Sequence, residues 1–430
     1  MKTGMMGSGR FGRFVVALGA LSLGLLVTGC GEECVDRIDC VNKQGAPPEG
    51  KQYACVDSHC EVRDVDMGPD AGTDAGTDAG TDTGPDAGTD AGTDAGVACT
   101  DLPHDEKLGT LQLQTGFAAA ESVTLPEGIG AVSAVQSGSD FKLYGLNGTD
   151  DSLYALGTWP AIAASTTPLQ PIVPEADQGA FPSGYLTNDG TRLLTGYAKA
   201  ETGFPGKVLV YDTATPADST YVSAAGNFTA DAVPGAFLIN GVGIQGVAEG
   251  GNAIYALKTD AKPLQGTKLA TFPVAGASSG FTAVTSDNIA VLGYSVPDPE
   301  ATGPFSPYIN RLTAVAPSVY TSALSSGTPF ALTNPNAIEI YSNTDLQGVA
   351  RFGQGVALHR GTFTATKEVS RMELTLGGIT PSTVTAGDLT PVLTTSNTCT
   401  HVVGMTPMGA DLLVSVKDKN GRRLVRLQQR

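Results

Sequence analysis

Residues 98–430 predict an all-β domain, on the evidence of their local pattern, their turn signals and their internal repeats. The region consists of short β-prone runs separated by many glycines and prolines, with almost no long apolar stripe of helical period. Dipeptides typical of two-residue hairpin loops, such as Asn420-Gly421 and Asp189-Gly190, join neighbouring apolar runs.

Two kinds of repeated unit alternate along this domain. The first kind comprises LYGLNGTDDSLYALG (143–157), IQGVAEGGNAIYALK (244–258) and LQGVARFGQGVALHR (346–360). The second kind comprises LTNDGTRLLTGY (186–197), VTSDNIAVLGY (284–294) and MTPMGADLLVSV (405–416). Three copies of each kind predict six β units of about 50 residues.

Alternating β units of this length resemble the blades of β-propellers, in which four-stranded sheets pack around a central channel. The resemblance implies a β-propeller, with six blades favoured over seven; a pair of β-sandwiches or a β-helix is the alternative fold. Cys99 and Cys399 bracket the domain. We expect them to be able to pair, which would hold the N-terminal strand near the last blade and close the ring.

The N-terminus predicts an export signal. Residues 1–13 carry Lys2, Arg10 and Arg13 with no acid, and Phe14 to Val27 are uncharged and almost wholly apolar. This is a basic region followed by a hydrophobic region, as in a secretory signal peptide. The apolar run is shorter than the roughly 20 residues that a transmembrane helix needs, so a retained anchor helix is the weaker interpretation.

Residues 26–30 (LVTGC) resemble the lipobox of bacterial lipoproteins. The resemblance implies that residues 1–29 are a signal peptide, that Cys30 is lipidated on its sulfur, and that the new amino group is acylated, for example with palmitate. Val27 and Thr28 depart from the commonest lipobox residues; an ordinary cleaved signal is the alternative. Gly31 stands where inner-membrane lipoproteins usually have Asp, which implies anchoring in the outer membrane.

The cysteine count is consistent with export. Removing Cys30 from the seven cysteines leaves an even number of disulfide candidates, namely Cys34, Cys40, Cys55, Cys60, Cys99 and Cys399. Residues 30–60 hold the first four with little aliphatic core, so they predict a small disulfide-rich module. The spacing leaves three pairings open, and a zinc site is the alternative to disulfides.

Residues 61–97 predict a disordered, acidic linker. They are built on TDAG repeats with no large apolar side chain to offset the entropy of ordering. Calcium binding by the repeated aspartates is the alternative. The formal net charge is −17, and removal of a signal with three positive charges and no acid makes it −20. Such a charge argues against nucleic acid as a partner.

Catalytic motifs are weak in this sequence. Residues 276–280 (GASSG) fit the G-x-S-x-G nucleophile elbow, but Phe281 to Tyr294 predicts a strand where the elbow needs a helix. The four histidines include no pair spaced to share one helix face, so no transition-metal site is indicated. We therefore predict no catalytic, cofactor-binding or metal residue.

These features together predict a tethered binding protein. It would be anchored through Cys30, face the periplasm or the cell surface, and bind a protein or saccharide at the propeller mouth. An envelope enzyme of the propeller type, such as a lactonase, glycosidase or quinone-dependent dehydrogenase, is the alternative, because propeller enzymes assemble their sites from several blades. A surface spacer without a specific ligand is a third interpretation.

Overall fold

A computed structural model gives the fold in two compact units, Met1–Ala91 and Gly92–Arg430. The structure describes residues 51–56, 59–64, 99, 102–148, 152–163, 167–171, 181–182, 186–198, 206–244, 252–259, 265–299, 308–361, 368–378, 383–395 and 397–430. The signal peptide, Cys30, Cys34, Cys40 and residues 65–97 of the expected linker lie outside the described residues.

The described residues of the first unit form an antiparallel hairpin of β1 (Lys51–Val56) and β2 (His59–Asp64). Its backbone register places Cys55 opposite Cys60. The disulfide pairing expected for this module stays a prediction.

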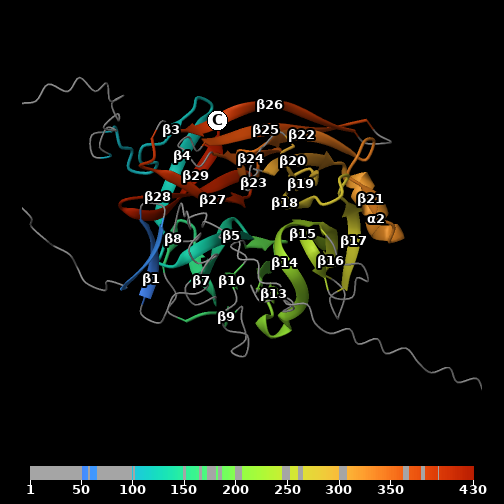
Figure 1. Ribbon diagram of the computed structural model, residues 1–430, viewed down its shortest axis with the longest axis horizontal. Helices are drawn as coiled ribbons and strands as arrows, with labels where there is room; N and C mark the ends of the chain where they lie inside the picture. The colour runs from blue at the N-terminus through green and yellow to red at the C-terminus, as the bar shows by residue number, and fades with distance from the viewer. Residues whose placement is uncertain are drawn as a thin grey trace, which may run out of the picture. The chain divides into compact units, whose positions relative to one another are not determined.

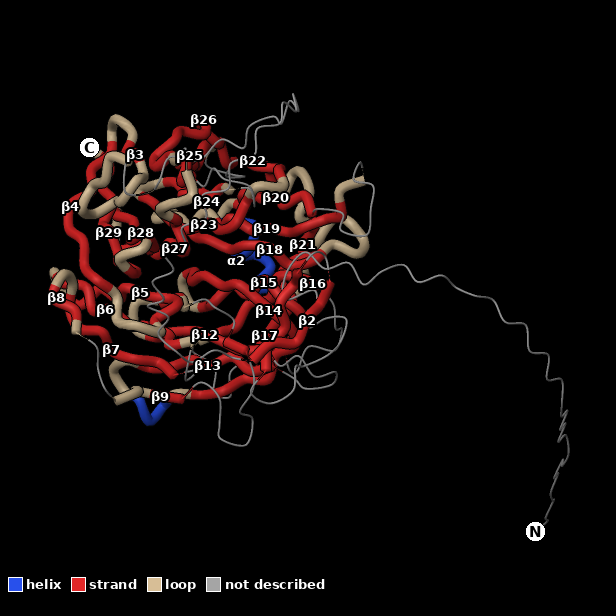
Figure 2. Tube along the Cα trace, turned by 60° about the vertical axis from the view of Figure 1, so that its left-hand side comes forward, coloured by secondary structure: helices blue, strands red, loops and turns tan. Residues whose placement is uncertain are grey.

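The second unit is built from six blades of antiparallel strands, and within each blade the strands run outward from a central channel (Figures 1 and 2). Blade 1 comprises β5 (Ile129–Ser137), β6 (Asp140–Asn147), β7 (Ser152–Thr158) and β8 (Ala161–Ile162). Blade 2 comprises β11 (Thr187–Asn188), β12 (Arg192–Ala198), β13 (Gly206–Asp212) and the first part of β14 (Thr220–Val233). Blade 3 comprises the second part of β14, β15 (Ala236–Ile244), β16 (Asn252–Lys258) and β17 (Gln265–Thr271).

Blades 4 to 6 repeat the arrangement. Blade 4 comprises β18 (Ser278–Val284), β19 (Ala290–Pro297), β20 (Tyr308–Val315) and β22 (Ala337–Asn343). Blade 5 comprises β23 (Leu346–Phe352), β24 (Gly355–Arg360), β25 (Glu368–Gly377) and β26 (Thr383–Thr394). Blade 6 comprises β27 (His401–Met408), β28 (Asp411–Asp418), β29 (Gly421–Gln429) and β4 (Phe117–Thr124).

The innermost strands form a closed ring. β5, β11, β14, β18, β23 and β27 contact one another in that order, and β27 contacts β5. Blades 2 and 3 share one sheet, because β14 pairs with β13 over its first residues and, after a register shift between Ala225 and Thr229, with β15. The six-bladed β-propeller predicted from the repeats is therefore confirmed, and the seven-bladed, sandwich and β-helix alternatives are excluded.

The core is divided among the blade interfaces. In the described part of the chain, six clusters of buried apolar residues lie between neighbouring blades, one for each interface. Successive side chains of a strand point to opposite faces. On β12, Leu193 accordingly packs toward blade 1 and Leu194 toward blade 3. The second strands thus have runs of residues buried on both faces, which explains their stretches of adjacent apolar residues.

A few short elements add to the blades. β9 (Gln170–Pro171) pairs with β7, β10 (Phe181–Pro182) with β12, and β21 (Phe330–Ala331) with β17. Helix α2 (Pro317–Ser326) follows β20 and buries Tyr320 and Ala323 against blades 3 and 4. Among the described helices, none combines the length and apolar character needed to cross a membrane.

The N-terminal strands close the ring. β4 pairs with β29 as the outermost strand of blade 6, and β3 (Gln112–Leu113) pairs with β26 of blade 5. Cys99 and Cys399 form a disulfide with a Cα–Cα distance of 5.5 Å. The pairing expected from the sequence is present, and it joins the segment before β3 to the segment before β27.

The repeat alignment was wrong in one place. The copies at 143–157 and 244–258 cover the second and third strands of their blades, whereas the copy at 346–360 covers the first and second strands of blade 5. Each aligned segment still corresponds to one blade, so the predicted number of blades was right. The alignment was wrong about which strands of blade 5 the third copy covers.

Candidate functional site: the central channel

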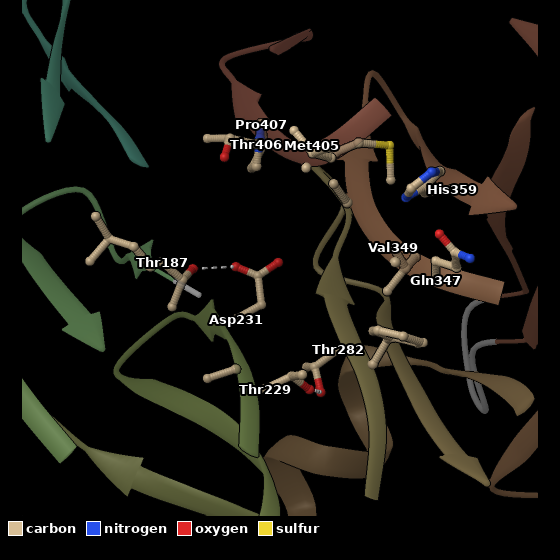
Figure 3. Close-up of a pocket in the computed structure, with 17 residues that line it drawn as sticks. Thr187, Thr229, Asp231, Thr282, Gln347, Val349, His359, Met405, Thr406 and Pro407 are labelled. Carbon is tan, nitrogen blue, oxygen red and sulfur yellow. Dashed lines mark hydrogen bonds between the residues drawn. The ribbon is translucent and has the colours of Figure 1, made fainter. Parts of the chain in front are cut away.

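Two adjoining cavities occupy the centre of the ring. The inner cavity, of about 310 Å³, is lined from five of the six innermost strands and by His359 of β24 (Figure 3). The second cavity, of about 370 Å³, is lined by Ser133 of β5 and by turns at one end of the blades, and we call it the turn-side cavity. Both are within the size range of small-molecule sites. The two cavities share Leu186, Thr187, Asp231, Thr406 and Pro407.

The turn-side cavity is bounded by the hairpin turns that join first and second strands. In every blade this turn contains one residue with positive φ, a region that favours glycine. These residues are Gly138, Gly190, Gly235, Asn288, Gly353 and Gly409. Four of them, Gly190, Gly235, Asn288 and Gly409, line the cavity. The six equivalent turns therefore lie around one mouth of the channel.

Asp231 is placed at the junction of the two cavities. Its Oδ1 accepts hydrogen bonds from the Ala232 N–H (2.8 Å) and the Thr187 hydroxyl (3.2 Å), and its Oδ2 accepts one from the Val284 N–H (2.7 Å). Burial raises the pKa of the Asp231 carboxyl above its usual value, although these donors and the positive charge of Arg351 act in the opposite direction. The carboxyl group thus links blades 2, 3 and 4 while it lines the channel.

Further polar contacts join neighbouring blades along the channel. Asn188 of blade 2 donates to the Ser133 hydroxyl (2.7 Å) of blade 1, and Thr406 of blade 6 donates to the Val132 carbonyl (2.5 Å). Thr229 of blade 3 donates to the Gly280 carbonyl (2.8 Å) of blade 4. Each of these hydrogen bonds joins two neighbouring blades. Together they provide partners for polar groups of the innermost strands.

The opposite side of the inner cavity contributes other functional groups. Gln347, Val349 and His359, all from blade 5, lie across the cavity from Thr187 and Asp231, with Met405 nearby on blade 6 (Figure 3). His359 as a whole residue is 6% exposed. The described residues contain no group of three or more His, Cys, Asp or Glu side chains that could hold a metal ion. The inner cavity therefore offers one carboxyl, one imidazole, one amide and several hydroxyls.

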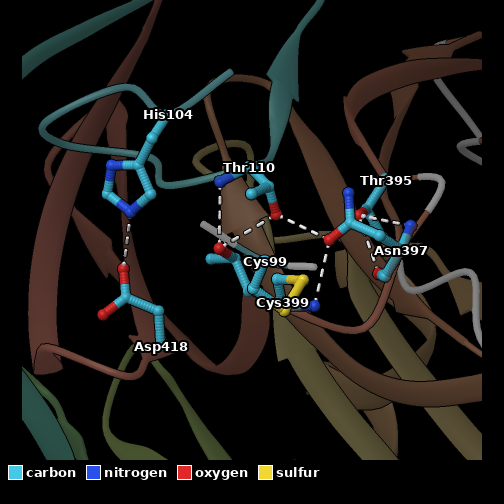
Figure 4. The surroundings of a disulfide bond; sticks show 8 residues. Cys99, His104, Thr110, Thr395, Asn397, Cys399 and Asp418 are labelled. Carbon is cyan, nitrogen blue, oxygen red and sulfur yellow. Dashed lines mark hydrogen bonds and ion pairs between the residues drawn. A yellow bond between two sulfur atoms is a disulfide. The ribbon is translucent and has the colours of Figure 1, made fainter. Parts of the chain in front are cut away.

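A second cluster surrounds the disulfide (Figure 4). The Thr110 N–H donates to the Thr400 hydroxyl (2.9 Å), and the Thr110 hydroxyl donates to Asn397 Oδ1 (2.8 Å). Nearby, His104 Nε2 lies 3.4 Å from Asp418 Oδ2, which also pairs with Arg423 at 2.8 Å. These contacts fasten the segment before β3 to blade 6, and we assign them a structural role.

The structure places the residues of the weak sequence motifs as follows. Ser278 begins strand β18, so the G-x-S-x-G segment leads into a strand, as its sequence predicts. His104 lies beside Asp418, His401 begins β27, and His359 lines the channel. Sequence reasoning missed Asp231 and Arg351, because each is an isolated charge in an ordinary strand pattern and nothing local marks it as facing the channel.

No family model matches the chain, and no curated protein matches it. Among solved structures, the chain is similar to a chain in the complex of Drosophila plexin A with semaphorin 1b. The identity is 8% and the TM-score 0.38, over 74% of this chain and 88% of that chain. Strand pairing and the ring of inner strands define the protein as a six-bladed β-propeller, and both polar and apolar residues line its central channel.

Proposed function

We propose that this protein is a lipid-anchored protein of the outer membrane that presents its β-propeller as a ligand-binding domain at the cell envelope. The observation that carries the binding role is the pair of adjoining cavities in the channel, with charged and polar side chains contributed by different blades. A concave site with a few convergent polar groups is the usual form of a small-molecule site.

The anchor is supported by the sequence alone. Residues 26–30 fit a lipobox, and Cys30 leaves an even number of cysteines when it is set aside. Several acyl chains, each contributing about 0.8 kcal/mol per buried methylene, would hold the protein at the membrane permanently. The acidic stretch between the first module and the propeller would act as a spacer that separates the binding domain from the lipid surface.

The anchor is tested by labelling cells with an alkyne analogue of palmitate. We expect the intact protein to incorporate the label and to fractionate with the outer membrane, and Cys30→Ala to lose both properties. Cys34→Ala is the matched control and should keep the label. Incorporation by the Cys30→Ala variant, or an unlabelled wild-type protein, would exclude this anchor.

The binding role is tested with the secreted, non-lipidated full chain against a panel of saccharides, peptides and small metabolites. A variant that fills the channel, Val349→Trp, should lose binding, whereas Val274→Trp, at an exposed position outside the channel, should keep it. Chemical conversion of a bound probe would instead favour the enzyme alternative. A folded protein that binds no probe in the panel would favour the spacer interpretation.

A further inference from the structure

Two opposite charges from different blades line the turn-side cavity. Asp231 is on β14 of blade 3, and Arg351 is on β23 of blade 5, with blade 4 between them. Arg351 is near enough for its positive charge to favour the ionised form of Asp231. Among the described residues, however, no ion pair joins the two side chains.

The Arg351 guanidinium lacks a hydrogen-bond partner among the described residues. Its side chain is partly buried, and its Nε is enclosed without a hydrogen-bond partner. No hydrogen bond or ion pair among the described residues involves its guanidinium. Buried arginines are usually paired, because the guanidinium has five N–H donors and cannot lose its charge. A ligand carboxylate is the group that its planar fork matches best.

Asp231 keeps capacity for one more partner. Each carboxylate oxygen can accept about two hydrogen bonds. Among the described residues, Oδ1 accepts two hydrogen bonds, from Thr187 and Ala232, whereas Oδ2 accepts one, from the Val284 N–H. The remaining site on Oδ2 suits a cationic donor, since an ammonium group would offset the burial of the charge.

Two other polar side chains that line this cavity, Asn188 and Asp189, are already occupied. Asn188 donates to Ser133 and to the Ala134 carbonyl, and the Asp189 carboxylate pairs with Arg192 at 3.8 Å and accepts hydrogen bonds within its own turn. Asp231 and Arg351 are therefore the charged groups of the cavity that remain available to a ligand.

We propose that the turn-side cavity binds a small zwitterion, with its ammonium group at Asp231 and its carboxylate at Arg351. This inference rests on the proposed binding function and specifies the ligand class for it. A molecule with both charges would give each of the two side chains a partner of opposite charge. An amine or a carboxylate alone would satisfy only one of them.

The test uses a series of ω-amino acids in which the charge separation increases: glycine, β-alanine, γ-aminobutyrate and ε-aminocaproate. Butylamine and butanoate carry one charge each and serve as matched controls. Binding to the secreted full chain is measured by calorimetry and by the shift in Tm. We expect one length in the series to bind best, and both monofunctional probes to bind at least about tenfold more weakly, because each lacks a charged hydrogen bond.

Two variants test which charged group of the ligand each side chain binds. Arg351→Gln should remove the preference for the zwitterion over butylamine, and Asp231→Asn should remove the preference over butanoate. Because none of the described residues makes a hydrogen bond or ion pair with Arg351, Arg351→Gln is expected to fold and remains informative if Asp231→Asn does not. Asp411→Asn and Arg426→Gln, which disrupt an ion pair of blade 6 at 2.6 Å, should leave binding unchanged.

Two outcomes separate this inference from the broader function. If the zwitterions do not bind but a neutral saccharide does, and Val349→Trp abolishes that binding, the ligand class is wrong and the binding role stands. If the folded protein binds none of these probes, the inference and the binding role both fail. Equal affinity for ε-aminocaproate, butylamine and butanoate would also overturn the inference.

Discussion

Asp231 and Asp418 show how the surroundings of a carboxyl group set its effect on stability. Burial dominates at Asp231 and raises the pKa of its carboxyl. At Asp418 burial acts in the same direction, but hydrogen bonds from Arg423 and from the Asn420 N–H, with the charges of Arg423 and His104, lower the pKa below its usual value. A raised carboxyl pKa makes folding less favourable as pH increases, and a lowered pKa makes it more favourable.

We predict that the cost of Asp231→Asn becomes smaller as pH rises. The unfolded carboxyl titrates near pH 4 and the folded one above it, so the wild type loses stability through that window while the asparagine variant does not. Urea unfolding of both proteins from pH 4 to pH 7 measures the difference. A difference in unfolding free energy that grows with pH would contradict the raised pKa.

The opposite dependence is expected for Asp418→Asn. Near neutral pH the variant should lose about 2 kcal/mol, because a charged hydrogen bond to Arg423 is replaced by a neutral one. The loss should diminish as pH falls below 4 and the wild-type carboxyl becomes protonated. The exposed Asp388 gives the control variant, Asp388→Asn, for the same urea titration. A cost independent of pH would show that packing, rather than charge, is responsible.

At the scale of the elements, the first hairpin of each blade is the unit that repeats. It combines a turn residue of positive φ with a second strand buried on both faces. The apolar pairs Leu193-Leu194, Val291-Leu292 and Leu412-Leu413 serve this purpose, because their members pack against different blades.

This pattern explains what the sequence could and could not predict. Apolar second strands and glycine turns are local, so blade number and fold class could be predicted. The strands covered by the copy at 346–360 could not be predicted. Its residues Leu346 to Gly348 begin a first strand, but their sequence resembles residues 143–145, which belong to a second strand. The channel site was missed for a similar reason: Asp231 meets Thr187 and Val284 from strands 44 and 53 residues away.

Turn substitutions should follow backbone geometry. Gly190 has φ +95° and open space where a Cβ would lie, so Gly190→Ala should cost about 1–2 kcal/mol through backbone strain alone. Gly409→Ala should cost more, since its Cβ would lie 3.0 Å from the Phe141 ring. Asn288→Gly, at φ +60°, should be neutral or stabilising. Denaturant unfolding of the three variants gives the ranking, and an equal cost for Gly190→Ala and Gly409→Ala would contradict it.

At the scale of the whole molecule, closure of the ring depends on residues far apart in sequence. β4 belongs to the N-terminal part of the chain, yet it completes the last blade by pairing with β29. The disulfide spans 300 residues and joins the same two regions. The six blades otherwise follow one another in sequence order. The ring is therefore closed by residues far apart in sequence at one place, where β4 joins blade 6.

We predict that the double variant Cys99→Ser/Cys399→Ser loses about 5 kcal/mol of stability, because the disulfide restricts a very long loop in the unfolded chain. The loss should also be unevenly distributed. Without the covalent link, β4 can separate from β29 while the remaining blades stay packed, so amide exchange should accelerate first in β3, β4 and β29. β15 and β16, in the middle of the chain, are the internal reference and should keep their protection until global unfolding. Uniform acceleration across all six blades would mean that the disulfide stabilises the fold only through the unfolded state and that strand pairing alone holds the ring closed.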